Sequence, residues 1–266
     1  MADFTKRYGP WALIAGASEG IGAAFARALA QRGLDLALVA RRLEPLLQLE
    51  REIAALAPVR VRCITLDLGR GDAAERLEHE LADLDVGLLV YNAALAPTGA
   101  FLEIALEEQL AAIAVNVHGP LALAHRFGRR MTSRGAGGIV LLSSLTAFQG
   151  SPFVATYGAT KSFLLTLADG LWYELAPRGV DVLAVCAGAT RSPSYLRRRS
   201  PKGAPGELEP DDVAREALAR LGRGPSMIPG RFNRFASQLL RRLLSRRAAI
   251  RLMGAQTGRL MLSSMG

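Results

Sequence analysis

The sequence of 266 residues has few of the residue types that build disulfide frameworks and metal centres. It contains two cysteines and three histidines. Cys63 and Cys186 both lie in apolar, strand-like runs, VRCITL and VLAVCAG, where a cysteine usually serves as a small buried hydrophobe. The histidines His79, His118 and His125 have no metal-ligand spacing among them. We therefore expect neither a disulfide nor a bound metal.

Long apolar runs are absent as well. Apolar residues make up 50% of the chain, yet no run approaches the roughly 18 to 20 residues of a membrane span. The first residues, MADFTKRYGPWALIAGA, show neither the long apolar stretch nor the small-residue cleavage site of a secretory signal. These absences predict a cytoplasmic protein, and the length favours one large domain.

Lysine is the scarcest charged residue. Only Lys6, Lys161 and Lys202 occur, and the remaining 30 basic residues are arginines. The net charge of +9 is uneven: residues 1–190 carry 17 basic and 19 acidic residues, whereas residues 191–266 carry 16 and 5. A basic end of this kind can bind nucleic acid, but no aromatic-rich basic stripe or zinc finger accompanies it. We therefore expect no nucleic-acid partner.

Short apolar runs alternate with longer segments in which apolar residues recur three and four positions apart. The runs predict buried strands at 11–15, 34–40, 59–66, 88–91, 138–143 and 180–185. The longer segments predict helices at 21–32, 44–57, 73–83, 106–131, 156–176 and 211–221. Strands that alternate with helices imply a parallel sheet covered on both faces. The predicted fold class is α/β, a single doubly wound domain spanning residues 1–266.

A glycine-rich turn, GASEGIG from residue 16, joins the first predicted strand to a helix. Its three glycines let the backbone turn sharply and approach a diphosphate closely, and the helix start offers free N–H groups and the positive end of a dipole. The turn predicts a nucleotide site, the alternative being a strand-to-helix turn that only packs. The candidate contacts are Gly16, Ser18, Glu19, Gly20, Ile21 and Gly22.

The ends of the next two strands indicate which coenzyme fits. Where an acidic residue would bind an unphosphorylated adenosine ribose, the chain has Arg41 and Arg42. Because a guanidinium suits a 2′-phosphate, we expect NADP(H) to be favoured over NAD(H), unless both arginines only cap the strand in solvent. Asp67, followed by Leu68, could accept a hydrogen bond from the adenine amine or cap the following turn.

One of the three lysines follows a tyrosine by four residues. Five tyrosines and three lysines in 266 residues would give about 0.06 such pairs by chance. On a helix, residues i and i+4 share a face, so the Lys161 ammonium can sit beside the Tyr157 phenol. A cation about 4 Å away at an effective dielectric of about 20 supplies the roughly 4 kcal/mol needed to lower the phenol pKa by about 3 units. The alternative is a packed aromatic with a solvated lysine nearby.

Eight residues together match the motif order and separations of a known family: Gly16, Gly20, Gly22, Asn92, Asn116, Ser144, Tyr157 and Lys161. On these motifs the sequence resembles the short-chain dehydrogenase/reductase family over residues 11 to about 193. The resemblance implies a seven-stranded Rossmann-type parallel sheet and hydride transfer between a nicotinamide and a carbonyl or alcohol carbon.

The resemblance also implies residue roles. Ser144 would donate a hydrogen bond to the substrate oxygen, and Tyr157 would act as general acid or base. Lys161 would lower the phenol pKa and hold the nicotinamide ribose, and Asn116 would hold a water linked to Lys161. Near the nicotinamide the resemblance implies Gly188, Thr190 and Ser192, with Ser192 at the family's threonine position.

Four positions depart from the family pattern. Ala15 replaces a threonine before the glycine turn, Tyr91 and Ala94 flank Asn92 and Ala93 where the family has NNAG, and Ala187 replaces a proline after the sixth strand.

The end of the chain diverges from the family pattern. Residues 194–230 form a candidate substrate region, in which 194–209 is either a mobile lid or a plain surface loop. Residues 231–266 form a basic amphipathic extension. Over 231–252 we expect one helix with Phe232, Phe235, Leu239, Leu240 and Leu243 on one face and Arg234, Arg241 and Arg242 opposite. Such a stripe packs on its own domain or a second subunit, or contacts a membrane surface.

We therefore expect an NADPH-dependent carbonyl reductase or alcohol dehydrogenase that forms a homo-oligomer. The apolar residues Leu145, Phe148, Phe153 and Tyr195 favour a hydrophobic substrate such as a steroid, a fatty acyl compound or an aromatic ketone. The alternative is a non-catalytic NADP-binding sensor on the same fold.

Overall fold

The computed structural model describes residues 2–197 and 203–262. Seven parallel strands form one sheet in the order β3-β2-β1-β4-β5-β6-β7. The strands are β1 Trp11–Ala15, β2 Asp35–Ala40, β3 Val61–Thr65, β4 Val86–Tyr91, β5 Gly137–Ser144, β6 Val180–Ala187 and β7 Ser226–Met227. This arrangement confirms the predicted α/β class and doubly wound sheet.

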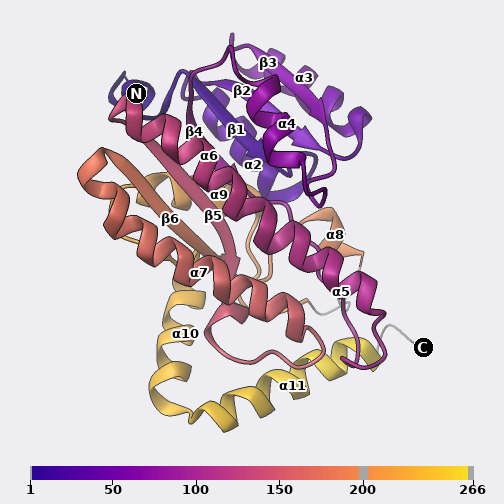
Figure 1. Ribbon diagram of the computed structural model, residues 1–266. Helices are drawn as coiled ribbons and strands as arrows, with labels where there is room; N and C mark the ends of the chain where they lie inside the picture. The colour runs from indigo at the N-terminus through magenta and orange to yellow at the C-terminus, as the bar shows by residue number, and fades with distance from the viewer. Residues whose placement is uncertain (1, 198–202, 263–266) are drawn as a thin grey trace.

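Helices cover both faces of the sheet (Figure 1). The helices α2 Gly20–Ala30, α3 Leu43–Leu56 and α9 Pro210–Arg220 pack on one face, and α4 Ala73–Glu80, α6 Gly119–Arg134 and α7 Ala155–Leu175 on the other. The remaining helices are α1 Ala2–Tyr8, α5 Leu106–Ile113, α8 Pro193–Leu196, α10 Arg231–Leu243 and α11 Arg246–Leu262. The last two lie beyond the end of the sheet.

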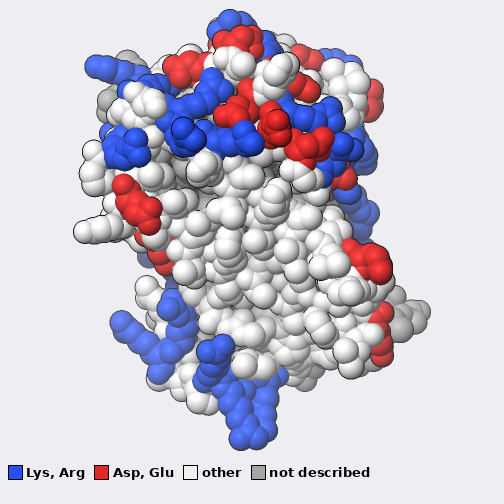
Figure 2. Space-filling model, in the orientation of Figure 1, with Lys and Arg blue, Asp and Glu red and all other residues white. Residues whose placement is uncertain are grey.

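The face that carries α6 and α7 is poor in charge. Figure 2 shows charged atoms crowded at the top of the molecule and arginines or lysines at the bottom, with a broad uncharged band over α6 and α7 between them. Six exposed large apolar residues belong to α5, α6 and α7: Leu106, Leu110, Ile113, Leu121, Trp172 and Tyr173.

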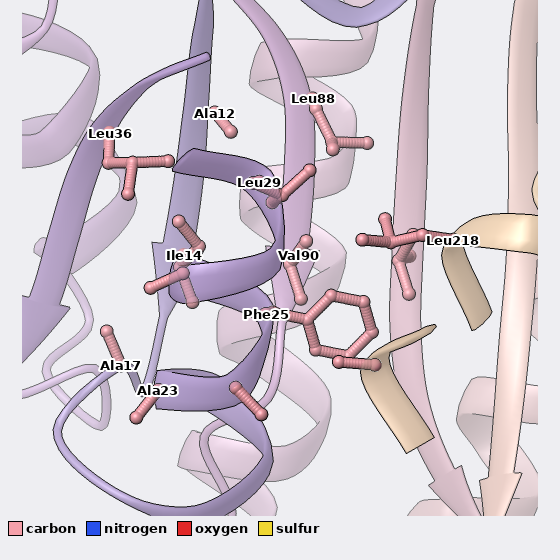
Figure 3. Close-up of a cluster of buried hydrophobic side chains, with 14 of the residues drawn as sticks. Ala12, Ile14, Ala17, Ala23, Phe25, Leu29, Leu36, Leu88, Val90 and Leu218 are labelled. Atoms are coloured by element: carbon pink, nitrogen blue, oxygen red, sulfur yellow. The ribbon is translucent and has the colours of Figure 1, made fainter. Parts of the chain in front are cut away.

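The strands are apolar throughout because both faces are buried. Along β1, Ala12 and Ile14 join the core under α2, whereas Leu13 and Ala15 join the core under α4 and α6. Figure 3 shows Phe25 and Leu29 of α2 lying against Ile14, Val90 and Leu88. The two cores fix the strand register and therefore the positions of the loops at the carboxyl ends of the strands.

The strand order reverses between β1 and β4, which pair with Ala15 opposite Tyr91. In open α/β sheets, ligands bind at this reversal, beyond the carboxyl ends of the strands. The glycine turn after β1 and the Asn92 loop after β4 therefore meet at the position where a coenzyme is expected.

Two predicted helices are interrupted. The helix expected at 106–131 splits into α5 and α6 around a wider π-helical turn, Ala114–His118, which turns Asn116 into the interior. The helix expected at 231–252 breaks after Leu243, because Leu244 is extended and Ser245 Oγ accepts a hydrogen bond from Ala248 N, 3.3 Å away, as the N-cap of α11. The single continuous helix over 231–252 was therefore wrong.

Candidate active site

The glycine turn is held so tightly that two of its positions admit no side chain. Gly16 has φ +88°, and a Cβ there would lie 2.5 Å from Ala93 N. A Cβ on Gly22 would lie 2.0 Å from Gly16 O. Glu19 is the N-cap residue of α2 but makes no capping hydrogen bond. The first N–H groups of α2, with Ser18 and Ile21 beside them, are therefore suited to a diphosphate.

The Asn92 loop is built onto this turn. Asn92 Nδ2 donates to Gly16 O at 2.8 Å, and the N–H groups of Asn92 and Ala93 both donate to Ala15 O. Asn92 thus fixes the backbone of the glycine turn, despite the departures at Tyr91 and Ala94. Tyr91 uses its hydroxyl to donate to Val115 O, and burial raises its pKa.

The basic residues after β2 differ in their surroundings. Arg41 is exposed and makes no ion pair or side-chain hydrogen bond with the described residues. Arg42 lies 3.6 Å from Glu19, which also lies 3.7 Å from Arg197 of the segment after α8. After β3, Asp67 Oδ1 accepts from Gly69 N at 2.9 Å, so one carboxylate oxygen caps the turn, and Leu68 is buried.

Tyr157 and Lys161 come together on the first turns of α7. The Lys161 Nζ lies 5.5 Å from the centre of the Tyr157 ring and donates to Leu142 O at 2.6 Å. The lysine side chain is 2% exposed, and its burial lowers the ammonium pKa to about 8. At neutral pH the ammonium still carries its proton, so it places a buried positive charge beside the phenol.

Two serines end β5, and their hydroxyl groups have different hydrogen-bond partners. Ser143 Oγ donates to Lys161 O at 2.8 Å and is buried. Ser144 points to the other side, because neighbouring strand residues alternate, and its Oγ accepts from Thr146 N at 3.2 Å. A hydroxyl that accepts from a backbone N–H keeps its own proton for another acceptor. This favours Ser144 as the donor to a substrate oxygen.

Asn116 joins the Asn92 loop to α7. Its Nδ2 donates to Leu95 O at 2.8 Å and to Thr160 Oγ1 at 3.0 Å, while its Oδ1 accepts from Leu95 N at 2.8 Å. Both amide hydrogens are therefore used within the protein, and the side chain is fully buried. The Nδ2 group therefore has no hydrogen left to donate to a water near Lys161, whereas Oδ1 has a second lone pair that can accept from one.

Thr160 is a residue that the motif pattern did not single out. Its Oγ1 accepts from Asn116 and donates to Tyr157 O at 2.7 Å, so it links the π-helical turn to the first turn of α7. The available signal was a threonine three residues after the tyrosine, on nearly the same helical face.

The loop after β6 reaches the glycine turn. A Cβ on Gly20 would lie 2.7 Å from Ser192 Cβ, so Ser192 packs directly on this turn. Ser192 Oγ accepts from Tyr195 N at 3.3 Å, as the N-cap of α8, and Thr190 Oγ1 donates to Gly188 O at 3.1 Å. The structure thus brings together the loops after β1, β4, β5 and β6.

A family model for short chain dehydrogenases matches residues 10–202. The chain belongs to this family. It is an oxidoreductase of the class that acts on CH–OH groups.

Three relatives place this dehydrogenase within the family. A 7β-hydroxysteroid dehydrogenase of Clostridium sardiniense is 34% identical over 234 residues, 87% of this chain and 90% of the relative. A solved 7β-hydroxysteroid dehydrogenase superposes with a TM-score of 0.89 at 31% identity, covering 94% of this chain and 99% of that one. A Sphingobium yanoikuyae short-chain dehydrogenase in complex with NADPH has a TM-score of 0.76 at 32% identity, covering 89% and 96%.

The match to the solved 7β-hydroxysteroid dehydrogenase includes much of the C-terminal extension. The match leaves out 6% of the 266 residues, which is about 16. The extension, residues 231–266, has 36 residues, so about 20 or more of them lie within the match. At least part of the extension therefore has a counterpart in that structure.

The dehydrogenase has one buried polar residue in this extension that the sequence pattern did not indicate. Asn233 of α10 is 5% exposed and its Nδ2 donates to Gly206 O at 2.9 Å. A Cβ on Gly188 would lie 3.0 Å from the same Nδ2. Asn233 therefore packs α10 against both the loop after β6 and the candidate lid. Its partners are distant in sequence, so no local signal could have found it.

Ion pairs and hydrogen bonds hold the described residues on both sides of the gap in the candidate lid, residues 194–209. Arg191 pairs with Glu207 at 3.4 Å and with Glu209 at 2.9 Å, and Tyr195 Oη donates to Glu207 at 2.5 Å. Residues 198–202 of the predicted lid lie outside the described residues.

The extension also encloses a groove of about 790 Å³ beside the active site. The loop 147–151, the outer side of α7 and apolar residues of the extension form its walls, the last being Leu240, Leu244, Ala249, Leu252 and Met253. Neither Ser144 nor Tyr157 lines it, so the groove lies behind the loop that follows Ser144. Arg241 of α10 stacks over Phe148 of this loop, 4.5 Å from the ring centre.

Proposed function

We propose that this dehydrogenase interconverts a hydroxyl group and a ketone on a bulky apolar ring compound of the hydroxysteroid class, with NADP(H) as coenzyme. The observation that carries the chemistry is the buried Lys161 ammonium, 5.5 Å from the centre of the Tyr157 ring and hydrogen-bonded to the Leu142 carbonyl near the carboxyl end of β5, the strand that Ser144 ends. The 34% identity to a 7β-hydroxysteroid dehydrogenase supports the substrate class.

In the reducing direction, a nicotinamide coenzyme held by the glycine turn would supply the hydride to the carbonyl carbon. Tyr157 delivers its phenolic proton to the carbonyl oxygen as negative charge develops there, and Ser144 donates a hydrogen bond to the same oxygen. Lys161 stabilises the phenolate that remains, because its buried charge is poorly screened. Asn116 and Thr160 keep the first turn of α7 in place through the Tyr157 carbonyl. Reversal of these steps oxidises the alcohol.

The coenzyme site fits a dinucleotide on the geometry of this chain. The glycine turn leaves the first N–H groups of α2 without a side-chain cap, and no Cβ fits at Gly16 or Gly22. Gly188, Thr190 and Ser192 would lie on the nicotinamide side, and Asp67, Leu68 and Asn92 on the adenosine side of the turn. Arg41, exposed and without a partner among the described residues, would hold a 2′-phosphate.

A homo-oligomer is part of this proposal. The uncharged band over α6 and α7 in Figure 2 and the exposed Leu106, Leu110, Leu121 and Tyr173 favour burial of this face against a second copy. Light scattering on the purified full chain should give a mass that is a multiple of 28.4 kDa, and a monomer at micromolar concentration would contradict this.

The experiment that tests the function is a coenzyme and substrate matrix. NADPH and NADH oxidation would be followed with ketosteroids oxidised at different ring positions, with aromatic ketones and with 3-oxoacyl thioesters. We expect NADPH-linked reduction of a ketosteroid, with the product position assigned by NMR, and the reverse reaction with the product and NADP. Turnover with acyl thioesters alone would contradict the substrate class. Tight NADPH binding without turnover on the whole panel would instead favour the non-catalytic sensor.

A further inference from the structure

Helix α10 presents its largest apolar residues to solvent. Phe232, Phe235, Leu239 and Leu243 are 57%, 65%, 43% and 71% exposed, and their spacing places them on one side of the helix. We call these four residues the α10 stripe. An amphipathic helix normally turns such a side toward the core, so the exposed stripe needs an explanation.

The inner side of α10 is already occupied. Asn233 donates to Gly206 O, and Arg234 bonds Glu216 at 2.8 Å and the Ile228 carbonyl at 3.0 Å. Further along, Leu240 lines the groove beside α7, and Arg241 stacks on Phe148. These contacts fix the rotation of the helix, so the α10 stripe cannot turn inward without breaking them. Two of the arginines predicted opposite the apolar face, Arg234 and Arg241, thus contact the domain, and the predicted apolar face points outward, with Leu240 at its edge and 43% exposed.

The surroundings of the α10 stripe carry one sign of charge. Arg231 and Arg242 on α10 and Arg246 and Arg247 at the start of α11 are exposed and form no ion pair with the described residues, and Arg246 also lines the groove beside α7. No acidic residue follows Glu216 in the sequence. In Figure 2 the lower edge of the molecule, where α10 and α11 lie in Figure 1, shows basic atoms without acidic ones among them.

From this geometry we propose that the α10 stripe is a membrane-docking surface, with the helix lying in the headgroup region of an anionic bilayer. The stripe enters the boundary between headgroups and acyl chains, and the four flanking arginines meet lipid phosphates. A second copy fits less well, because two α10 helices packed stripe to stripe would bring arginines of like charge together. None of the described helices is long and apolar enough to cross a membrane, so this is a surface contact.

The test is vesicle co-sedimentation of the full chain. Vesicles of phosphatidylcholine with about 30 mol% phosphatidylglycerol would be compared with pure phosphatidylcholine vesicles at about 50 mM and about 500 mM salt. We expect binding to the anionic vesicles that weakens at high salt. The double variant Phe235→Ser/Leu239→Ser should weaken this binding about tenfold or more, and Arg242→Gln/Arg246→Gln should weaken it about fivefold per arginine on anionic vesicles.

The matched control is Leu102→Ser, which removes an exposed leucine outside the extension, 93% accessible to solvent, and should leave vesicle binding unchanged. Ketone reduction measured in parallel shows that each variant is folded. Absence of binding at low salt, or equal binding by wild type and the Phe235→Ser/Leu239→Ser variant, would overturn the proposal. A change of oligomeric mass in that variant with unchanged vesicle binding would also overturn it, in favour of a contact between copies.

Discussion

The core over residues 11–193 and the extension over residues 231–262 solve the same physical problem in opposite ways. In the core, apolar side chains fill two layers under the helices, and surface charges pair, as in Arg60 with Asp35 and Arg62 with Asp83. In the extension, a buried asparagine and inward arginines hold α10 in place, while phenylalanines and leucines face solvent. The buried layers of the core are filled from within the chain, whereas the largest apolar side chains of α10 are left exposed.

The core and the extension therefore differ in function: the core holds the candidate catalytic groups, and the extension makes contacts. Loops at the carboxyl edge of the sheet gather the candidate catalytic groups, and the extension contributes positioning through Asn233 and Arg241. We therefore expect substitutions in the core site to remove turnover, and substitutions on the α10 stripe to leave it unchanged.

The largest expected effect is on turnover in the core. Tyr157→Phe removes the acidic hydroxyl and should lower kcat about 10²- to 10⁴-fold, because that is the usual contribution of a positioned general acid. The dissociation constant of NADPH, measured by fluorescence titration, should stay within about twofold, since a phenyl ring keeps the packing. Tyr173→Phe, on the same helix and 78% exposed, is the matched control and should retain full activity.

Unchanged turnover in Tyr157→Phe would contradict the catalytic role of Tyr157, and with it the assignment of catalysis to the core. Loss of NADPH binding together with turnover would indicate a collapsed site and would also contradict the assigned role.

The next effect in size concerns the cost of burying Lys161. Its pKa is about 8 in the folded protein and 10.5 when unfolded, so the unfolded chain binds more protons between these values. Stability therefore rises with pH through this window, by about 3 kcal/mol in total, and this group causes no further change below about pH 8, where both states carry the proton. Lys161→Met should remove this dependence, as measured by urea unfolding at several pH values.

The difference between wild type and Lys161→Met isolates this group, because other groups titrate in both proteins. Burial raises the thiol pKa of Cys63 and of Cys186 to about 11. Both thiols therefore lower the stability above pH 9, and they do so equally in wild type and in Lys161→Met. Lys6→Met, at an exposed lysine, should show the wild-type pH profile. A wild-type profile in Lys161→Met would mean that the ammonium is hydrated.

The core could be predicted from the sequence because its signals are local. Apolar runs marked the strands from β1 to β6, the glycine turn marked the start of α2, and the Tyr157–Lys161 spacing marked one face of α7. Apolar periodicity alone did not show the π-helical turn at Ala114–His118, because that turn buries Asn116 against Leu95 and Thr160, which are distant in the chain.

The extension was harder to predict for the same reason. Apolar periodicity indicated a helix correctly but gave no information about its rotation, which Asn233, Arg234 and Arg241 set through contacts with distant residues. The break before α11 did have a local signal, the N-cap Ser245, which the continuous apolar pattern obscured. Strand β7, with two residues, and helix α8, with four, are too short to show periodicity.

A smaller effect is expected where the two regions meet. Asn233→Ala leaves the Gly206 carbonyl and the packing at Gly188 without a partner, so the free energy of unfolding should fall by about 1 to 3 kcal/mol. KM for the ketone should rise more than kcat falls, because the loops that border the substrate lose their support. Gln238→Ala, exposed on the same helix, is the control for both readouts. Equal kinetics in wild type and Asn233→Ala would show that the extension is uncoupled from the site.

The smallest effect belongs to Arg41, an exposed core charge that forms no ion pair with the described residues. Arg41→Ala should weaken NADPH binding about tenfold, about 1.4 kcal/mol, and leave NADH binding unchanged, because only NADPH carries the 2′-phosphate that a guanidinium would bind. Arg51→Ala, an exposed arginine on the adjacent α3 that pairs with Glu44, should change neither affinity. If Arg41→Ala weakened both coenzymes equally, Arg41 would be a solvent-facing charge like those of the extension. The pairing of surface charges found elsewhere in the core would then be absent where the coenzyme is expected to bind.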